Sequence, residues 1–367
     1  MTTVPEYRSD LDMWCVRDPD LVRQVLVDPA TYDPANALTA VHPISSENLR
    51  TLAVSDFALP PTLANNATKT HSAIRAVVAR HFSGGVVTAA EPEIRAVARA
   101  HLRPLASRIA EGERVDLVAG YASEAPAQVL ITLLGLKDID VLALKRWSAD
   151  SLELFWGFPD SDRQRQLAAS AAEFYQWLSE WVRRDVRDNS QGLFAALAAL
   201  DLSHTEICAA AYFLMVAGHE TTTQLVSTVL WRVAREPQRW WDPDVDVASA
   251  GRRLVDEVLR SQSSVPTWRR VATRDAVLGG VTIPAGAAVL LHLTDGGGDA
   301  SLAFGVGVHR CLGVRLALSE AAVAVQEVVA ELPPVAAVEA LPPMLDLLSF
   351  QAPRRVLVER VAASTPG

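Results

Sequence analysis

The chain has 367 residues, half of them hydrophobic, and a formal net charge of −9 at pH 7. This length allows a large hydrophobic core, and the acidic balance argues against a nucleic-acid-binding surface, because phosphate contacts require clustered Lys and Arg. The longest apolar run, residues 207–218, is shorter than the ~20 residues that span a bilayer, and the charged N-terminus lacks the apolar core of a signal peptide. We therefore expect a cytoplasmic protein that binds neither nucleic acid nor membrane.

Apolar residues recur at three- and four-residue spacing along most of the chain, a pattern typical of amphipathic helices. It predicts helices over residues 19–28, 70–82, 91–110, 120–135, 139–155, 163–188, 203–235, 247–262 and 312–331. Short strands are predicted at Val271–Val277, Val281–Pro284, Ala288–Leu293 and near Arg355–Val358. The sequence therefore predicts a mainly α fold with a small β-sheet.

Three stretches show neither helical nor strand periodicity: residues 33–69, 156–162 and 293–310. Loops of this length inside a compact protein are usually functional. The first has the apolar and small residues expected of a segment that encloses a substrate, and the third leads to a cysteine. Since no internal repeat or long linker divides the chain, we expect residues 1–367 to form a single domain.

The three cysteines, Cys15, Cys208 and Cys311, are too widely separated to suggest a zinc site or a disulfide framework. Cys311 follows a glycine-punctuated loop, residues 304–310, and precedes a predicted helix. Glycines let this loop turn sharply, and Gly313 leaves room for a flat ligand. The free N–H groups of a helix N-terminus favour the thiolate, the form of cysteine that ligates metals. A free cysteine is more often a small buried apolar residue, and we assign that role to the other two.

The segment around Cys311 resembles the cysteine loop of the cytochromes P450, F-x-x-G-x-x-x-C-x-G, matched in full at Phe304, Gly307, Cys311 and Gly313. The residues that follow, Leu316, Ala317 and Glu320, are similar to that family's next helix, and the resemblance runs from about residue 13 to about residue 359. It implies a helical fold with a small β-subdomain, in which the cysteine ligates the iron of a b-type haem and its thiolate favours O–O cleavage.

Residues 217–222, A-G-H-E-T-T, resemble the family's A-G-x-[DE]-T segment. By this resemblance Ala217 and Gly218 leave room above the haem, and Glu220 and Thr221 form the acid–alcohol pair that supplies protons, a general-acid role. In an ordinary helix the same residues would be no more than an acidic side chain and an N-cap-like threonine. The position of the segment upstream of the cysteine loop favours the functional interpretation.

Haem carries two propionates, which need cationic or hydrogen-bonding partners. Four residues resemble the family's usual contributors: His71, Arg75, Arg270 and His309. Phe304 and Gly305 complete the haem contacts that the resemblance implies. A lone histidine or arginine is more often a solvated surface group, but four at matching places favour a haem site.

Glu257 and Arg260 lie on one face of a predicted helix. The same spacing occurs at Glu111–Arg114 and Glu180–Arg183, which we interpret as surface pairs. Only Glu257–Arg260 lies where the P450 family keeps its E-x-x-R helix, so we assign the structural role to that pair alone.

Two features depart from the family pattern. Little precedes Trp14, which suggests a shortened N-terminus, and residues 295–303 contain no arginine where relatives place a meander whose arginine joins the E-x-x-R pair. We expect Glu257 and Arg260 either to pair closely with each other or to recruit a substitute, such as a backbone carbonyl or another arginine. Because the meander borders the face where a ferredoxin docks, common ferredoxins are expected to support turnover poorly.

The sequence thus predicts a haem-thiolate monooxygenase of bacterial specialised metabolism, an oxidoreductase that uses O2 and electrons from a ferredoxin-type partner to oxidise a hydrophobic small molecule. The missing meander leaves two alternatives: a haem-thiolate isomerase, dehydratase or peroxide-driven oxidant, and a non-catalytic haem-binding interaction module. Retention of Glu220 and Thr221 argues against the first. The expected substrate-pocket residues are 33–69, Phe155–Phe158, Val216, Val265–Trp268 and Phe350.

Overall fold

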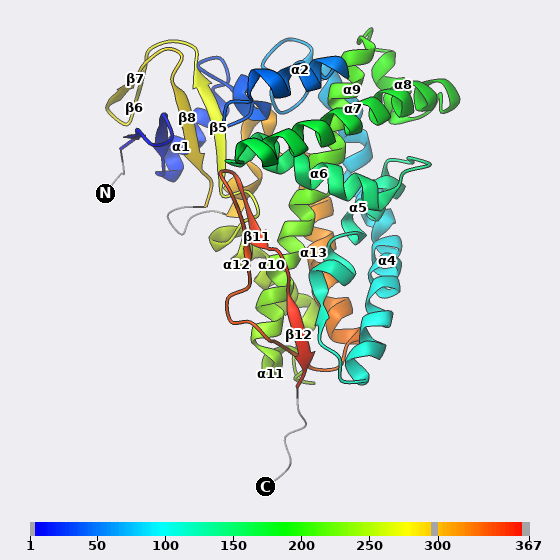
Figure 1. The fold of residues 1–367 in the computed structure, drawn as a ribbon. Helices are drawn as coiled ribbons and strands as arrows, with labels where there is room; N and C mark the ends of the chain where they lie inside the picture. The colour runs from blue at the N-terminus through cyan, green and yellow to red at the C-terminus, as the bar shows by residue number, and fades with distance from the viewer. Residues whose placement is uncertain (1–3, 295–299, 362–367) are drawn as a thin grey trace.

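Helices make up the body of the protein, and most strands lie together beside its N-terminal region (Figure 1). The structure, a computed structural model, describes residues 4–294 and 300–361. Its α-helices are α1 (Pro19–Val27), α2 (Ser46–Val54), α3 (His71–Ala79), α4 (Gly84–Ala110), α5 (Ala125–Leu133), α6 (Val141–Trp156), α7 (Ser161–Asp188), α8 (Leu193–Ala198), α9 (His204–Ala217), α10 (Glu220–Arg235), α11 (Pro237–Trp240), α12 (Val247–Ser261) and α13 (Val314–Glu331).

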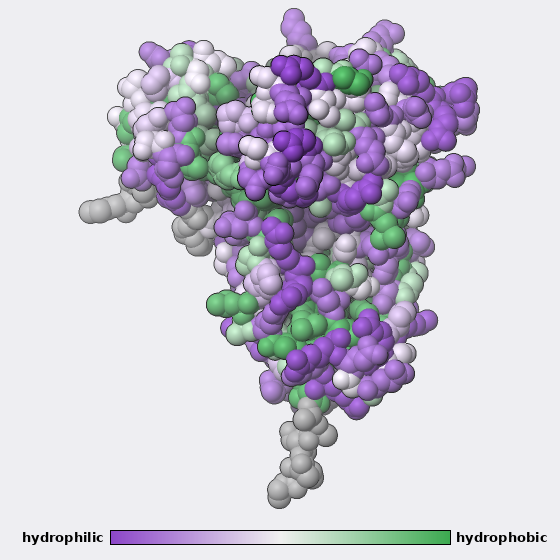
Figure 2. Space-filling view, in the orientation of Figure 1, coloured by the Kyte–Doolittle hydropathy of each residue, from purple (hydrophilic) through white to green (hydrophobic). Residues whose placement is uncertain are grey.

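The centre of the helical body is the α9–α10 segment. α10 packs against α13, α12 and α5, and Figure 1 shows it beside α13 with α4 on the outer side. Residues on every face of α9 and α10 are buried, which is the pattern of a helix surrounded by others rather than one lying at a surface. The surface in Figure 2 is mainly hydrophilic, with apolar residues in small patches.

A five-stranded sheet lies beside this body, with strand order β1 (Glu6–Arg8), β2 (Met13–Val16), β8 (Ala288–His292), β5 (Thr267–Ala272) and β3 (Tyr32–Asp33). In β5, Trp268 is opposite Leu291 and Arg269 is opposite Leu290 of β8. Successive side chains of a strand point to opposite faces, so Arg269 lies on the face opposite to Trp268 and Arg270.

The remaining strands form three small sheets. β12 (Leu357–Arg360) lies between β4 (Val115–Asp116) and β9 (Val335–Ala337). The other two sheets are hairpins, β6 (Ala276–Leu278) with β7 (Val281–Ile283) and β10 (Met344–Leu347) with β11 (Phe350–Pro353).

The predicted mainly α fold with a small β-sheet is confirmed, and most predicted helices are present. Three local predictions were wrong. The helix predicted over 203–235 is two helices that separate at Gly218–His219. The stretch 33–69, predicted to be irregular, contains α2, and Ser45 caps this helix by accepting a hydrogen bond from the Asn48 N–H. The strand predicted over 271–277 is divided between β5 and β6. In the last case the chain bends at Thr273–Arg274, directly after the end of β5. Within the described residues, no helix has the length and apolar character needed to cross a bilayer.

Candidate active site

A cavity lies between the α9–α10 break, the loop before α13 and strand β5. Its wall includes all the residues predicted from the sequence to bind a cofactor: His71, Arg75, Ala217, Gly218, Arg270, Phe304, Gly305, His309, Cys311 and Gly313. These residues come from four separate segments of the chain, and the fold brings them together around one space. Thr221 also lines the cavity, whereas Glu220 does not.

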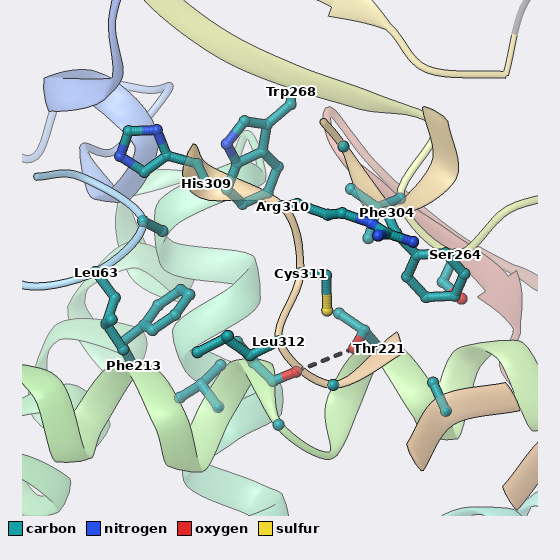
Figure 3. Close-up of a pocket in the computed structure, with 18 of the residues that line it drawn as sticks. Leu63, Phe213, Thr221, Ser264, Trp268, Phe304, His309, Arg310, Cys311 and Leu312 are labelled. Atoms are coloured by element: carbon teal, nitrogen blue, oxygen red, sulfur yellow. Dashed lines mark hydrogen bonds between the residues drawn. The ribbon is translucent and has the colours of Figure 1, made fainter. Parts of the chain in front are cut away.

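Cys311 is exposed to this cavity, whereas Cys15 and Cys208 are buried as predicted. Figure 3 shows its sulfur directed into the cavity, with Thr221 of α10 in the facing wall. The loop is closed by a hydrogen bond from the Cys311 N–H to the Phe304 carbonyl, 2.9 Å. Gly307 has a φ of 77°, and a Cβ there would lie 3.0 Å from the Leu26 carbonyl oxygen, so both backbone conformation and close packing require glycine.

Burial raises the pKa of the Cys311 thiol, although the Gly313 N–H and the charges of Arg75 and Arg310 oppose this effect. The N–H group at the start of α13 lowers this pKa as predicted, but the expected net lowering is wrong for the polypeptide alone, because desolvation outweighs the favourable contacts. When a cysteine coordinates a metal, its thiol is deprotonated and the proton is released. The buried Cys208 has a pKa raised to about 11 by desolvation and contacts His204 instead of a cavity.

Cationic side chains line one side of the cavity. Arg75 Nη2 donates to the Arg310 carbonyl at 2.6 Å, and Arg270, only 2% exposed, donates from Nη1 to the Arg269 carbonyl at 2.8 Å. Among the described residues neither Arg75 nor Arg270 forms an ion pair with a carboxylate. The Arg270 Nε is buried without a hydrogen-bond partner. Burial lowers the pKa of Arg270 to about 10, so its charge remains at neutral pH.

Two histidines lie beside these arginines, with the rings of His71 and His309 4.5 Å apart between centroids. Burial, followed by the neighbouring His309 and Arg75, lowers the pKa of His71 to about 4. His309 Nε2 donates to the Asn66 carbonyl at 2.8 Å, while its Nδ1 is buried without a partner. That Nδ1 becomes a donor when the ring is protonated, which a nearby carboxylate favours.

Glu220 and Thr221, the two residues predicted to supply protons, begin α10 directly after the helix break at Gly218–His219. The Thr221 hydroxyl lines the cavity and donates to the Ala217 carbonyl at 3.0 Å, across the break (Figure 3). Glu220 points away from the cavity wall and is only 6% exposed. Its Oε1 accepts a hydrogen bond from Lys145 Nζ of α6 at 2.5 Å, in a buried ion pair.

Sequence analysis did not single out Lys145, the partner of Glu220. Its ammonium also donates to Thr223 Oγ1 at 3.1 Å and lies 3.3 Å from His219 Nδ1. The other ring nitrogen of His219 lies 3.2 Å from Ser148 Oγ, also on α6. The available signal was a lysine on a helix otherwise suited to burial, in a chain with only three lysines; its partner became visible only in the folded structure.

Comparison with known proteins identifies the family. Vitamin D(3) 25-hydroxylase of Pseudonocardia autotrophica is 31% identical over 294 residues, which cover 72% of this chain and 69% of that protein. Cytochrome P450 monooxygenase PikC of Streptomyces venezuelae is 27% identical over 89% of this chain and 79% of that protein. The solved structure of cytochrome P450 CREJ in complex with (4-ethylphenyl) dihydrogen phosphate matches with a TM-score of 0.88 and 26% identity, over 97% of this chain and 94% of that one. No family profile matches the chain.

The chain belongs to the cytochrome P450 family. It is an oxidoreductase of the monooxygenase type, and its cofactor is haem, with iron as the metal. The chemistry of the cavity fits this group: a thiol directed into the space can hold iron, and the buried donors of Arg270 and His309 that have no partner suit the two propionate carboxylates.

The predicted direct ion pair between Glu257 and Arg260 is wrong. Glu257 pairs with Arg232 of α10, and Arg260 pairs with Asp256 at 2.6 Å. Both predicted partners have side chains about half exposed, 54% and 48%, so water solvates their charges and no buried charge requires a direct partner. The alternative that another arginine substitutes is the one seen at Glu257. Of the expected shortened meander, residues 295–299 lie outside the described residues.

The buried His219 is expected to make the stability of this P450 depend on pH. Full burial, reinforced by Lys145, holds the pKa of His219 well below its ordinary value of about 6.5. The unfolded chain then binds a proton that the folded protein does not, so this contribution to stability is complete above about pH 6.5 and is lost as pH falls. We expect the free energy of unfolding to fall by up to about 1.4 kcal/mol per pH unit between pH 6.5 and 5.

Denaturant unfolding at pH 7 and pH 5 measures this effect. The variant His219→Asn should show a weaker loss of stability on acidification than the unaltered protein, and His42→Asn, which replaces an exposed imidazole, serves as the control. An equal pH dependence in all three proteins would contradict the prediction.

Proposed function

We propose that this cytochrome P450 holds a b-type haem on Cys311, hydroxylates a hydrophobic small molecule of bacterial specialised metabolism and receives its electrons from a ferredoxin-type partner. The observation that carries the proposal is the Cys311 thiol, directed into a cavity whose remaining wall is largely apolar and aromatic. The same cavity therefore offers an iron ligand and a dry space for an apolar substrate.

The apolar part of the cavity contains residues from every segment that the sequence predicted to form the substrate pocket, although only a few come from the long stretch 33–69: Leu38, Leu59, Leu63, Phe155, Val216, Val265, Trp268 and Phe350. The Trp156 and Phe350 rings meet edge to face with centroids 5.0 Å apart, a geometry that favours rigid packing of aromatic rings. Phe158 was expected in this pocket, but its side chain is 60% exposed and does not line the cavity. An aromatic wall of this kind suits a ligand with little polarity.

A thiolate-ligated haem supplies oxidative chemistry, in which electron density from the sulfur favours O–O cleavage. The polypeptide supplies positioning and protons. We assign proton donation at the cavity to the Thr221 hydroxyl, which must first exchange its hydrogen bond to the Ala217 carbonyl, and we assign the supply of that proton to Glu220. Because Lys145 holds the Glu220 carboxylate in an ion pair, Glu220 must release this contact and take up a proton from solvent before it can pass a proton toward Thr221. Lys145 is thus a positioning residue in this proposal.

The proposal is tested on the purified protein by a pyridine haemochrome spectrum, which distinguishes b-type haem, and by turnover assays with a panel of apolar compounds. We expect b-type haem and product formation that needs O2, NAD(P)H and a reductase with a ferredoxin. A dedicated ferredoxin should support turnover better than common ferredoxins. Product formed with peroxide but never with O2 and any electron donor would favour the peroxide-driven alternative, and a haem protein that forms no product would favour the interaction module.

A further inference from the structure

Arg269 is a buried arginine on the face of β5 opposite to Arg270. Its residue exposure is 4%, and neighbouring segments of the fold cover it. Nη2 donates to the Thr39 carbonyl at 2.7 Å, and the guanidinium carbon lies 5.9 Å from the centre of the Trp156 ring. These are contacts with a neutral carbonyl and a neutral aromatic ring, so neither cancels the charge.

No carboxylate of the described residues forms an ion pair with Arg269, and its Nε is buried without a hydrogen-bond partner. Burial alone lowers the pKa of Arg269 to about 10, which still leaves it charged at neutral pH. A buried charge that has no counter-charge costs several kcal/mol, and a cation–π contact offsets only part of that cost. Arg269 is therefore a buried cation with its Nε–H available as a donor, at a position where an apolar residue would cost less free energy of folding.

The position of Arg269 connects it to the cavity. Trp156, against which the guanidinium lies, is part of the cavity wall, and so is Leu38, next to Thr39. The end of α6 is held here by two backbone hydrogen bonds, Val41 N–H to the Phe155 carbonyl and Leu348 N–H to the Trp156 carbonyl, both 3.0 Å.

Residues next to these segments reach solvent. Thr39 and His42 are exposed, and the Phe158 side chain is 60% exposed. Arg269 itself does not line the cavity; Trp156, the buried last residue of α6, contacts the Arg269 guanidinium and forms part of the cavity wall, where it packs against other aromatic rings.

We propose that Arg269 binds an oxyanionic group, a carboxylate or a phosphate monoester, at one end of an otherwise apolar substrate. The inference rests on the proposed function only in placing the substrate in this cavity. The Nε–H that lacks a partner and the neighbouring Nη2 present adjacent donors on one edge of the guanidinium, the arrangement that suits a planar carboxylate or two phosphate oxygens. Binding requires the Trp156 ring to move, and the ligand then supplies the missing counter-charge.

This assignment separates the two buried arginines of β5 by the face on which each lies. Arg270 faces the proposed haem propionates, and Arg269 serves the substrate. With its anionic end held at Arg269, the substrate extends its apolar part along the aromatic wall, so the distance from the anion to the oxidised carbon is set by the protein.

Isothermal titration calorimetry of the haem-loaded protein tests the inference with matched ligand pairs. The probes are decanoate with decanamide and para-butylbenzoate with para-butylbenzamide, in which a neutral amide replaces the carboxylate; decyl phosphate distinguishes phosphate from carboxylate recognition. We expect at least one anion to bind ~10-fold or more tightly than its neutral partner, since hydrogen bonds to a charged group are stronger than those between neutral groups.

Arg269→Gln should remove this preference, and Arg269→Lys should retain part of it because the charge remains. Arg274→Gln is the matched control, since that arginine is exposed and donates a hydrogen bond to Thr31 Oγ1 at 2.6 Å. Anions that bind no better than the amides, or a preference that persists in Arg269→Gln, would overturn the inference. Calorimetry measures binding and does not depend on turnover, so the two proposals can fail separately. Tighter binding of the anions without any product would refute the proposed function alone. Turnover of neutral substrates, without tighter binding of the anions, would refute the role of Arg269 alone.

Discussion

Replacing Cys311 with alanine is expected to abolish the red-shifted Soret band that the reduced protein gives with carbon monoxide, a signature of thiolate ligation. Of the three cysteines, Cys311 is the one exposed to the cavity. No other described cysteine can replace it, because Cys208 is 0% exposed and Cys15 is 3% exposed. The measurement is the difference spectrum of the carbon monoxide complex, recorded at equal protein concentration.

The variants Cys15→Ala and Cys208→Ala are the matched controls. Each removes a buried sulfur, which costs about 1 kcal/mol of stability as for a typical core substitution, and each should keep the red-shifted band. Loss of the band in both controls with the fold intact, or its survival in Cys311→Ala, would show that the iron ligand is assigned to the wrong residue.

Replacing Thr221 with alanine is expected to lower the product formed per NAD(P)H consumed by ~10-fold or more; a positioned proton donor contributes ~10²–10⁴-fold to the rate of the step that it assists. The hydroxyl lines the cavity, and the Ala217 carbonyl fixes its direction. Haem content should remain as in the unaltered protein, because a methyl group still fills the same part of the wall. Reducing equivalents that no longer reach product should appear as hydrogen peroxide.

Thr228→Ala provides a control on the same helix. Thr228 Oγ1 donates to the Gln224 carbonyl at 3.0 Å, the same helical hydrogen bond that Thr221 makes with Ala217, but Thr228 does not line the cavity. Both variants therefore lose an equivalent backbone contact, and only one loses a hydroxyl at the site. Equal coupling of NAD(P)H to product in the two variants would argue that Thr221 has a structural role alone.

The cysteine loop was predictable because its requirements are local. Gly307 must adopt a positive φ beside the Leu26 backbone, and Cys311 must follow at a fixed spacing, so sequence alone records the geometry. The break at Gly218–His219 was not predicted, although its residues were noted. Apolar periodicity continues through the break, so the sequence contains no sign of it; the folded structure also shows that Gly218 packs closely against α5, where a Cβ would lie 2.7 Å from the Leu130 side chain.

Charge pairing was predicted least well. The i, i+3 spacing of Glu257 and Arg260 is compatible with a direct pair, yet each lies nearer another partner in the folded protein. Lys145 and Glu220 are 75 residues apart and form the buried pair that the sequence did not indicate. Electrostatic energies depend on distance and burial, and neither quantity is recorded in a local sequence pattern.

The sequence by itself determined the mainly α fold, the family resemblance and the identity of the cysteine that faces the cavity, because helix periodicity, glycine turns and motif spacing are properties of short segments. Tertiary structure alone decided which charges are paired and which are buried. Arg269 and Arg270 are adjacent in sequence and chemically identical, but the alternation of β5 and the packing on its two faces direct one to the cavity beside Cys311 and the other behind Trp156.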